Sequence, residues 1–144
     1  MAFVSNSWQF WAFMAAIFAA LTAIFAKIGV EDVDSDFATF LRTIVIVFAL
    51  GLLVWGTGKL QSLDTITPRT WIFLVLSGLA TGASWLCYFK AMKLGDASQV
   101  APVDKLSVVF VAIIAAVFLG EKLSTFGWGG IVMIAVGSIL VAVS

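Results

Sequence analysis

Three charged residues stand inside apolar stretches of this sequence, and together they could bind an anion. Arg42 and Lys105 are cations, and Asp104 directly precedes Lys105. A bare charge at membrane depth is costly, so such residues need a partner or water and usually mark a functional site or its support. Asp104 can neutralise one of the two cations but not both, which leaves positive charge for a carboxylate or phosphate group. The alternative is an Arg42–Asp104 bridge, with the Lys105 side chain extended to the lipid headgroups.

Polar and aromatic side chains of the third apolar stretch are the candidates for a cavity wall. Ser77, Thr81, Ser84 and Tyr88 recur at steps of four, three and four, which places them on one face of a helix. Trp85 follows Ser84 and is the aromatic candidate for substrate contact, although a bulky packing role fits its position equally well. We therefore predict a substrate-binding set made of Arg42, Ser84, Trp85, Tyr88, Asp104 and Lys105.

The composition is that of a membrane protein rather than of a soluble domain. Of the 144 residues, 62% are hydrophobic and 11% are charged, and the mean hydropathy is +1.14. Eight basic and eight acidic residues cancel, which leaves no basic footprint for nucleic acid. With no histidine and only Cys87, the chain has no ligand set for zinc or haem and no internal disulfide. No nucleophile–base set is evident, so we expect neither an enzyme nor a cofactor.

Five stretches are long and apolar enough to cross a lipid bilayer. They predict an all-α membrane protein with one domain, residues 1–144. The expected transmembrane helices, each of about 20 residues, cover about 8–28, 37–57, 69–91, 98–119 and 125–143. All connections are short, which favours antiparallel packing of neighbouring helices.

Polar loop residues predict where these helices begin. The expected N-caps are Ser7, then Ser35 or Asp36, Asp96 or Ser98, and Ser124 or Thr125. Thr67 and Pro68 start the third span. Pro102 is expected in or just past the first turn of the fourth span, where the missing N–H costs least.

Basic residues are divided evenly between the two ends of the predicted spans. Because successive spans alternate in direction, Lys59, Arg69 and Lys122 fall on one side, and Lys27, Lys90 and Lys93 fall on the other. Orientation normally follows an excess of Lys and Arg in cytoplasmic loops. Either the bias is too weak to read, or the chain inserts both ways up, which suits an antiparallel pair.

The sequence WLCYFKAMKLGDASQVAPVDKLSVVFV, followed by FLGEKL in the same span, resembles the EamA-type repeat of the drug/metabolite transporter superfamily. Trp11, Lys27 and Arg42 also lie where the first two spans of that repeat carry such residues. Typical members contain two five-span repeats of inverted topology, and this chain resembles a single repeat. The resemblance implies a secondary transporter of metabolites or drug-like molecules that acts by alternating access in the inner or plasma membrane. It would work as an antiparallel homodimer or with a paralogous partner.

The chain departs from the better-known branches of this superfamily. The small multidrug resistance branch is similar in size, but it has four spans and a glutamate in the first. Residues 8–26 contain no acid here, so proton-coupled export of cationic drugs is not implied. The Asp104-Lys105 pair is unusual for the ten-span exporters, whose substrates therefore do not carry over. Two alternative functions remain: an accessory or structural membrane subunit, in which the charges only fix helix packing, and a lipid-headgroup flippase.

Overall fold

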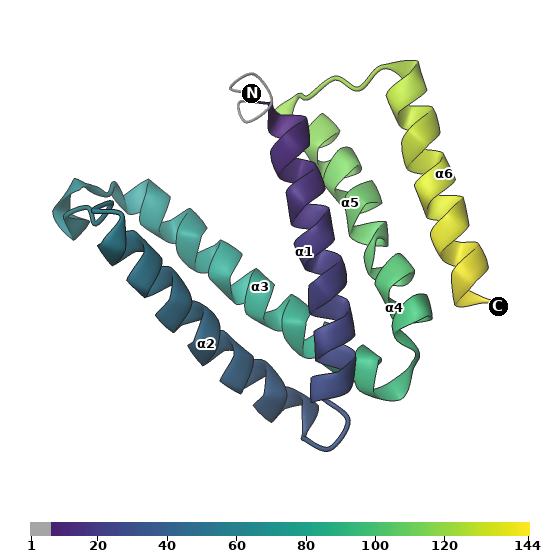
Figure 1. Cartoon of the computed structure of the whole chain (residues 1–144). Coiled ribbons are helices and arrows are strands. Elements are labelled where there is room, and N and C mark those ends of the chain that lie inside the picture. The colour runs from purple at the N-terminus through teal and green to yellow at the C-terminus, as the bar shows by residue number, and fades with distance from the viewer. Residues whose placement is uncertain (1–6) are drawn as a thin grey trace. The chain divides into compact units, whose positions relative to one another are not determined.

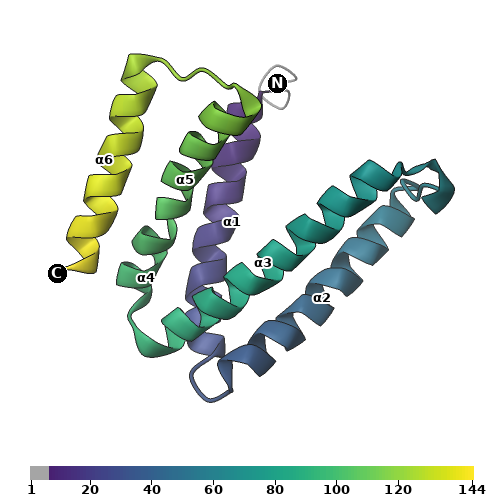
Figure 2. The same cartoon turned by 180° about the vertical axis from the view of Figure 1, so that it is seen from behind.

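A computed structural model describes residues 7–144, and these residues form helices and turns without a strand (Figures 1 and 2). In chain order the elements are α1 (Trp8–Gly29), α2 (Ser35–Gly56), the 3₁₀ turn η1 (Leu63–Thr65), α3 (Pro68–Leu94), α4 (Ala97–Asp104), α5 (Leu106–Ile114), the π-helical turn η2 (Ala115–Leu119) and α6 (Thr125–Ala142). Five helical segments are long and apolar enough to cross a membrane, with α4, α5 and η2 together forming the fourth. The expected all-helical fold with five spans is confirmed.

Side-chain caps explain where several helices start. The Ser7 hydroxyl accepts a hydrogen bond from the Phe10 amide at 3.3 Å, and the Ser124 hydroxyl accepts one from the Gly127 amide at 3.1 Å, both as expected. The prediction for α2 is wrong by one residue, because Asp34 is its cap. One Asp34 carboxylate oxygen accepts from the amides of Asp36 and Phe37 at 3.0 and 3.1 Å, which satisfies two free donors of the first turn.

The chain divides into two compact units, and residues 28–93 form one of them. Within this unit α2 and α3 form an antiparallel hairpin, which is visible in both views (Figures 1 and 2). Gly58 follows α2 with a φ of 64°, a left-handed conformation that glycine adopts at no steric cost. The buried residues of the unit gather near the other end of the hairpin: Val30, Ser35, Thr39, Phe89 and Met92.

Residues 7–27 and 94–144 belong to the second unit. Here α4 and α5 follow each other, and both pack against α6, which returns antiparallel to them. Gly120 has a φ of 68° and ends the fourth span, after which the Glu121 amide bonds back to the Ala115 carbonyl at 3.1 Å. The buried residues are small: Ala23, Ala26, Ala112, Ala115 and Ser138. Small residues let helix backbones approach closely in a membrane.

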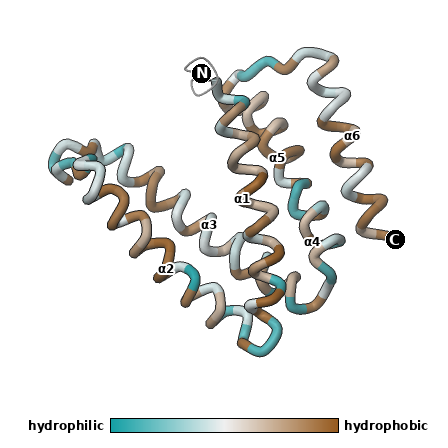
Figure 3. Tube along the Cα trace, viewed as in Figure 1, coloured by the Kyte–Doolittle hydropathy of each residue, from teal (hydrophilic) through white to brown (hydrophobic). Residues whose placement is uncertain are grey.

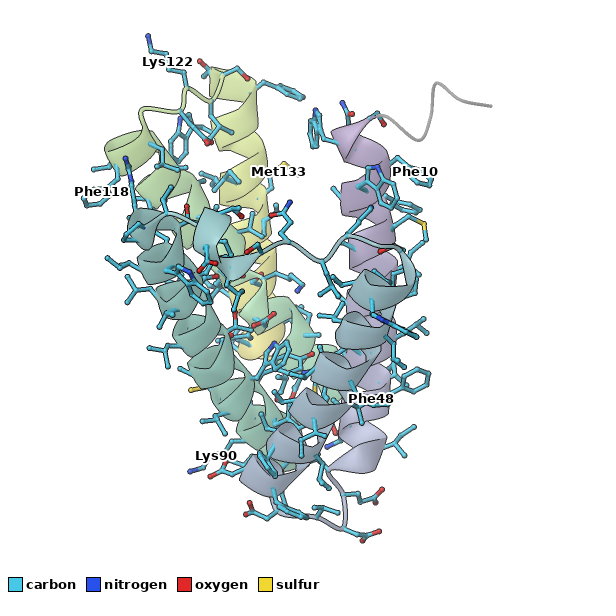
Figure 4. The ribbon with its side chains drawn as sticks, turned by 90° about the vertical axis from the view of Figure 1, so that its left-hand side faces the viewer. Phe10, Phe48, Lys90, Phe118, Lys122 and Met133 are labelled. Carbon is cyan, nitrogen blue, oxygen red and sulfur yellow. The ribbon has the colours of Figure 1, made fainter. Side chains whose placement is uncertain are left out.

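The helix surfaces of both units are apolar and largely uncovered. Only 6–11% of each membrane-spanning segment is buried within the chain. Hydrophobic residues run along the helices, and hydrophilic ones gather at the connections (Figure 3). Side chains such as Phe118, 79% exposed, project away from the ribbon (Figure 4). These faces require lipid or further helices as neighbours.

Candidate functional site

Arg42 on α2 lies against two aromatic rings of α3. Its guanidinium carbon is 4.2 Å from the centroid of the Trp85 ring and 5.4 Å from that of Phe89. Arg42 makes no ion pair or hydrogen bond with any residue of its own unit, 28–93. A guanidinium on an aromatic face gains about 0.5–2 kcal/mol of cation–π attraction, and its in-plane N–H donors remain free for an anion.

The sequence of α2 explains why its Arg42 face can approach α3. Ser35 and Thr39 lie on this face at a spacing of four and are buried, while Arg42 and Thr43 are half-buried. The hydroxyls of Thr39 and Thr43 each donate to the carbonyl one turn back, at 2.8 Å. These helix-internal bonds satisfy the polar groups without a partner helix. The small, satisfied side chains leave room for the large rings of α3.

Residues of α3 at a spacing of four provide the platform beneath the guanidinium. Trp85 and Phe89 share one helix face, and Phe89 is buried whereas Trp85 is half-buried. Tyr88 packs edge-on against Phe89, with ring centroids 6.5 Å apart. Tyr88 thus borders the platform through its contact with Phe89. Three of the six predicted site residues, Arg42, Trp85 and Tyr88, are therefore brought together.

Ser84 does not join this group. Its side chain is exposed and makes no hydrogen bond or ring contact with the described residues. The predicted polar face of α3 is largely exposed as well, because Ser77 and Thr81 are also uncovered. The Thr81 hydroxyl donates to the Ser77 carbonyl at 2.8 Å. Ser84 therefore belongs to an outward-facing stripe of α3 rather than to the Arg42 platform.

Asp104 and Lys105 lie in the other unit and pair with each other. The Lys105 ammonium is 3.2 Å from the Asp104 carboxylate, with side-chain exposures of 52% and 36%. Arg42 and Lys105 were the two candidate partners of Asp104, and the structure pairs Asp104 with Lys105. A pair this open to its surroundings contributes little to stability. The predicted site residues Arg42, Ser84, Trp85 and Tyr88 thus belong to unit 28–93, whereas Asp104 and Lys105 belong to the other unit.

The Asp104–Lys105 pair marks an interruption of the fourth span. We expected one helix over 98–119, with Pro102 in or just past its first turn. Pro102 is the sixth residue of α4, just past its first turn as expected, but α4 ends at Asp104. The Lys105 amide bonds to the Pro102 carbonyl, and the Val108 amide bonds to the Lys105 carbonyl, both at a tighter spacing of three. Proline removes a helical N–H and crowds the carbonyl four residues earlier, so Pro102 weakens the turn of α4 that precedes the break.

Two lysines that flank the loops bind backbone carbonyls. Lys27, at the end of α1, donates to the Gly95 carbonyl at 2.8 Å. Lys93, at the end of α3, donates to the Val33 carbonyl at 2.5 Å. Lys90 is exposed and has no such bond among the described residues. Lys27 and Lys93 are thus structural tethers of the loops.

Sequence reasoning missed Phe89 as part of the Arg42 platform. The signal was present, because Phe89 is four residues after Trp85 and lies on the same helix face.

Among residues 7–144, no three His, Cys, Asp or Glu side chains lie close enough together to hold a metal ion. The structure thus describes a guanidinium on aromatic rings in one unit and an ion pair at a helix break in the other.

Comparison with known proteins identifies the family. The model of the EamA-like transporter family matches residues 6–143. A Sinorhizobium sp. protein described as an uncharacterized transporter in the cobO 3′ region is 59% identical over 140 residues, which covers 97% of this chain and 99% of that protein. No solved structure matches the chain. Together with five membrane-spanning helices, these matches show that the chain is a multi-pass membrane protein that belongs to the EamA-like transporter family.

Proposed function

We propose that this protein is a secondary transporter of small molecules, which acts by alternating access in the inner or plasma membrane. Two copies of the chain in inverted orientation, or one copy with a paralogous partner, form the working carrier. The family and the related protein's description as a transporter support the activity. That relative is 99% covered by this chain, so it consists of little more than one such five-helix unit. Carriers of this kind bind substrate between two inverted halves.

The interruption of the fourth span is the observation that carries this proposal. Lys105 lies eight residues after Ala97, about 12 Å along the helix axis, so the break falls at membrane depth. Lys105 keeps right-handed helical backbone angles, φ −69° and ψ −8°, so the break is a tight 3₁₀ turn, and such a turn inside an α-helix often marks a functional hinge. An ion pair at the same place, Asp104–Lys105, also requires polar surroundings. A discontinuous helix with charged residues is the arrangement from which transporters build substrate sites.

Two further features support an inverted pair. The six basic residues near the span ends are divided three and three between the two sides, so they favour neither orientation. The spans are only 6–11% buried within the chain, which leaves ample apolar surface for a second copy. In this arrangement Arg42, Asp104 and Lys105 set charge selectivity, while Trp85, Tyr88 and the exposed Ser84 line the path.

Cysteine accessibility tests whether the break borders water. In a Cys87→Ser background, Ser107→Cys places a thiol on α5 just past the break, and Val136→Cys on α6 serves as an apolar control. A membrane-impermeant maleimide added to proteoliposomes should label position 107 rapidly and position 136 hardly at all. An accessory subunit that lacks a cavity would leave both positions unlabelled from either side, and this result would contradict the transporter proposal.

A further inference from the structure

Resting on the proposed function, we infer that Arg42, held on Trp85 and Phe89, binds a monoanionic oxyanion group of the transported molecule, with a carboxylate as the first candidate. This inference names the chemical class of ligand for the α2–α3 hairpin. It depends on residues 28–93 alone, which form one compact unit. Three properties of the guanidinium support the proposal: its position, its unoccupied N–H donors and its charge.

The Arg42 guanidinium lies alongside the third span, at the level of Trp85 and Phe89, rather than at the end of that span. Phe89 lies five residues before the end of α3 at Leu94, and Trp85 lies nine residues before it, or about 8 and 14 Å along the axis. The guanidinium is nearer to Trp85 than to Phe89, at 4.2 against 5.4 Å. An arginine that reached back to the headgroups would extend past Phe89 toward Lys93. The Arg42 guanidinium instead lies over both rings and is nearer to Trp85.

Within residues 28–93, no acidic side chain neutralises the guanidinium. The acidic residues of the unit are Glu31, Asp32, Asp34, Asp36 and Asp64, and none forms an ion pair with Arg42. Stacking on a ring occupies one face of the planar group and leaves its N–H donors in the plane. Those donors match the two oxygens of a carboxylate or phosphate in a bidentate arrangement. An unpaired charge in an apolar span is costly, so a ligand that neutralises it binds favourably.

The charge of the site selects a monoanion. Arg42 supplies a single positive charge, and the other cations of the unit lie at helix ends or in loops: Lys59, Arg69, Lys90 and Lys93. A dianion would leave one negative charge uncompensated in an apolar environment. Two sources provide a monoanionic oxyanion here, namely a soluble carboxylate and the phosphodiester of an anionic lipid. Trp85 is the positioning residue, because its ring is the nearer of the two to the guanidinium.

Thermal unfolding of the purified full chain in a neutral detergent tests this site. Sodium acetate, butyrate and benzoate are compared with sodium chloride at equal ionic strength, and phosphatidylglycerol is compared with phosphatidylcholine in mixed micelles. A ligand at about ten times its dissociation constant should raise the unfolding temperature by about 3–6 °C. Arg42→Gln should abolish the rise, Arg42→Lys should retain part of it, and Arg69→Gln should leave it intact as the matched control.

The two sources and the role of Trp85 give separate outcomes. A rise with a carboxylate that depends on Arg42 supports a soluble substrate, whereas one only with phosphatidylglycerol supports a lipid headgroup at the same oxyanion site. Trp85→Leu should weaken the response at least several-fold, and Trp85→Phe should restore it, because phenylalanine keeps an aromatic face. If neither ligand class gives a rise that Arg42→Gln removes, the inference is overturned. Since this assay needs no transport, it can fail while the transporter proposal stands, and the reverse also holds.

Discussion

The Arg42 guanidinium lies 4.2 Å from the centroid of the Trp85 ring, and this contact joins α2 to α3 at membrane depth. The two residues are 43 positions apart in the sequence. The contact positions an intramembrane cation without a carboxylate partner from residues 28–93. Removing the ring therefore has consequences for stability as well as for ligand binding.

Trp85→Leu should destabilise the protein, because it removes the cation–π contact and part of the packing against Arg42. The expected loss is about 1–3 kcal/mol, and Trp85→Phe should lose clearly less. Unfolding in mixed detergent micelles measures the difference. Trp71→Leu provides the control, since Trp71 lies exposed in the first turn of the same helix. Equal losses for Trp85→Leu and Trp71→Leu would show that the stacking contributes nothing.

Pro102→Ala should let the fourth span continue through Lys105. The substitution restores a helical N–H and removes the clash with the preceding turn, with an expected stabilisation of about 1–3 kcal/mol. Labelling of Ser107→Cys should fall at the same time, because the break no longer borders water. Pro68→Ala is the matched control: Pro68 is the first residue of α3, where proline costs no hydrogen bond. Unchanged labelling in Pro102→Ala would contradict the claim that the helix break borders a water-filled cavity.

Lys93→Met should loosen the connection between α1 and α2. It removes the hydrogen bond to the Val33 carbonyl at 2.5 Å, a contribution of about 0.5 kcal/mol given the exposure of Lys93. Hydrogen exchange of the amides in residues 30–34 should become about two-fold faster. Lys90→Met is the control, because Lys90 lies on the same helix without such a bond. Faster exchange in both variants would point to a general loss of lysine charge instead.

Apolar length was sufficient to predict the five spans. A stretch of about 20 apolar residues has few alternatives to a transmembrane helix, because its backbone must satisfy its own hydrogen bonds in lipid. The cap Ser7 was readable because it directly precedes an apolar run, whereas Ser124 was one of two adjacent candidates with Thr125. Asp34 was missed because Ser35 and Asp36 are also good caps. Only the backbone geometry decides which side chain faces the free amides of α2.

The candidate site was only partly predictable, for a physical reason. Arg42, Trp85 and Tyr88 stood out as polar or aromatic groups in apolar spans, and the structure brings them together. The role of Phe89 depends on the register between α2 and α3, which no local pattern specifies. Ser84 was expected beside Trp85, but adjacent residues on a helix point about 100° apart. The tight turn at Lys105 comes three residues after Pro102, and no local pattern indicated that the helix would be interrupted there.

The central claim is that one chain of this protein supplies both halves of a carrier, and the orientation of its C-terminus tests this claim most directly. Ser144→Cys in a Cys87→Ser background is labelled in intact cells with a membrane-impermeant maleimide, before and after permeabilisation. An inverted homodimer predicts that roughly half of the molecules react from outside and the rest only after permeabilisation. The equal number of basic loop residues on the two sides leads to the same expectation. Labelling of all molecules from one side alone would contradict it.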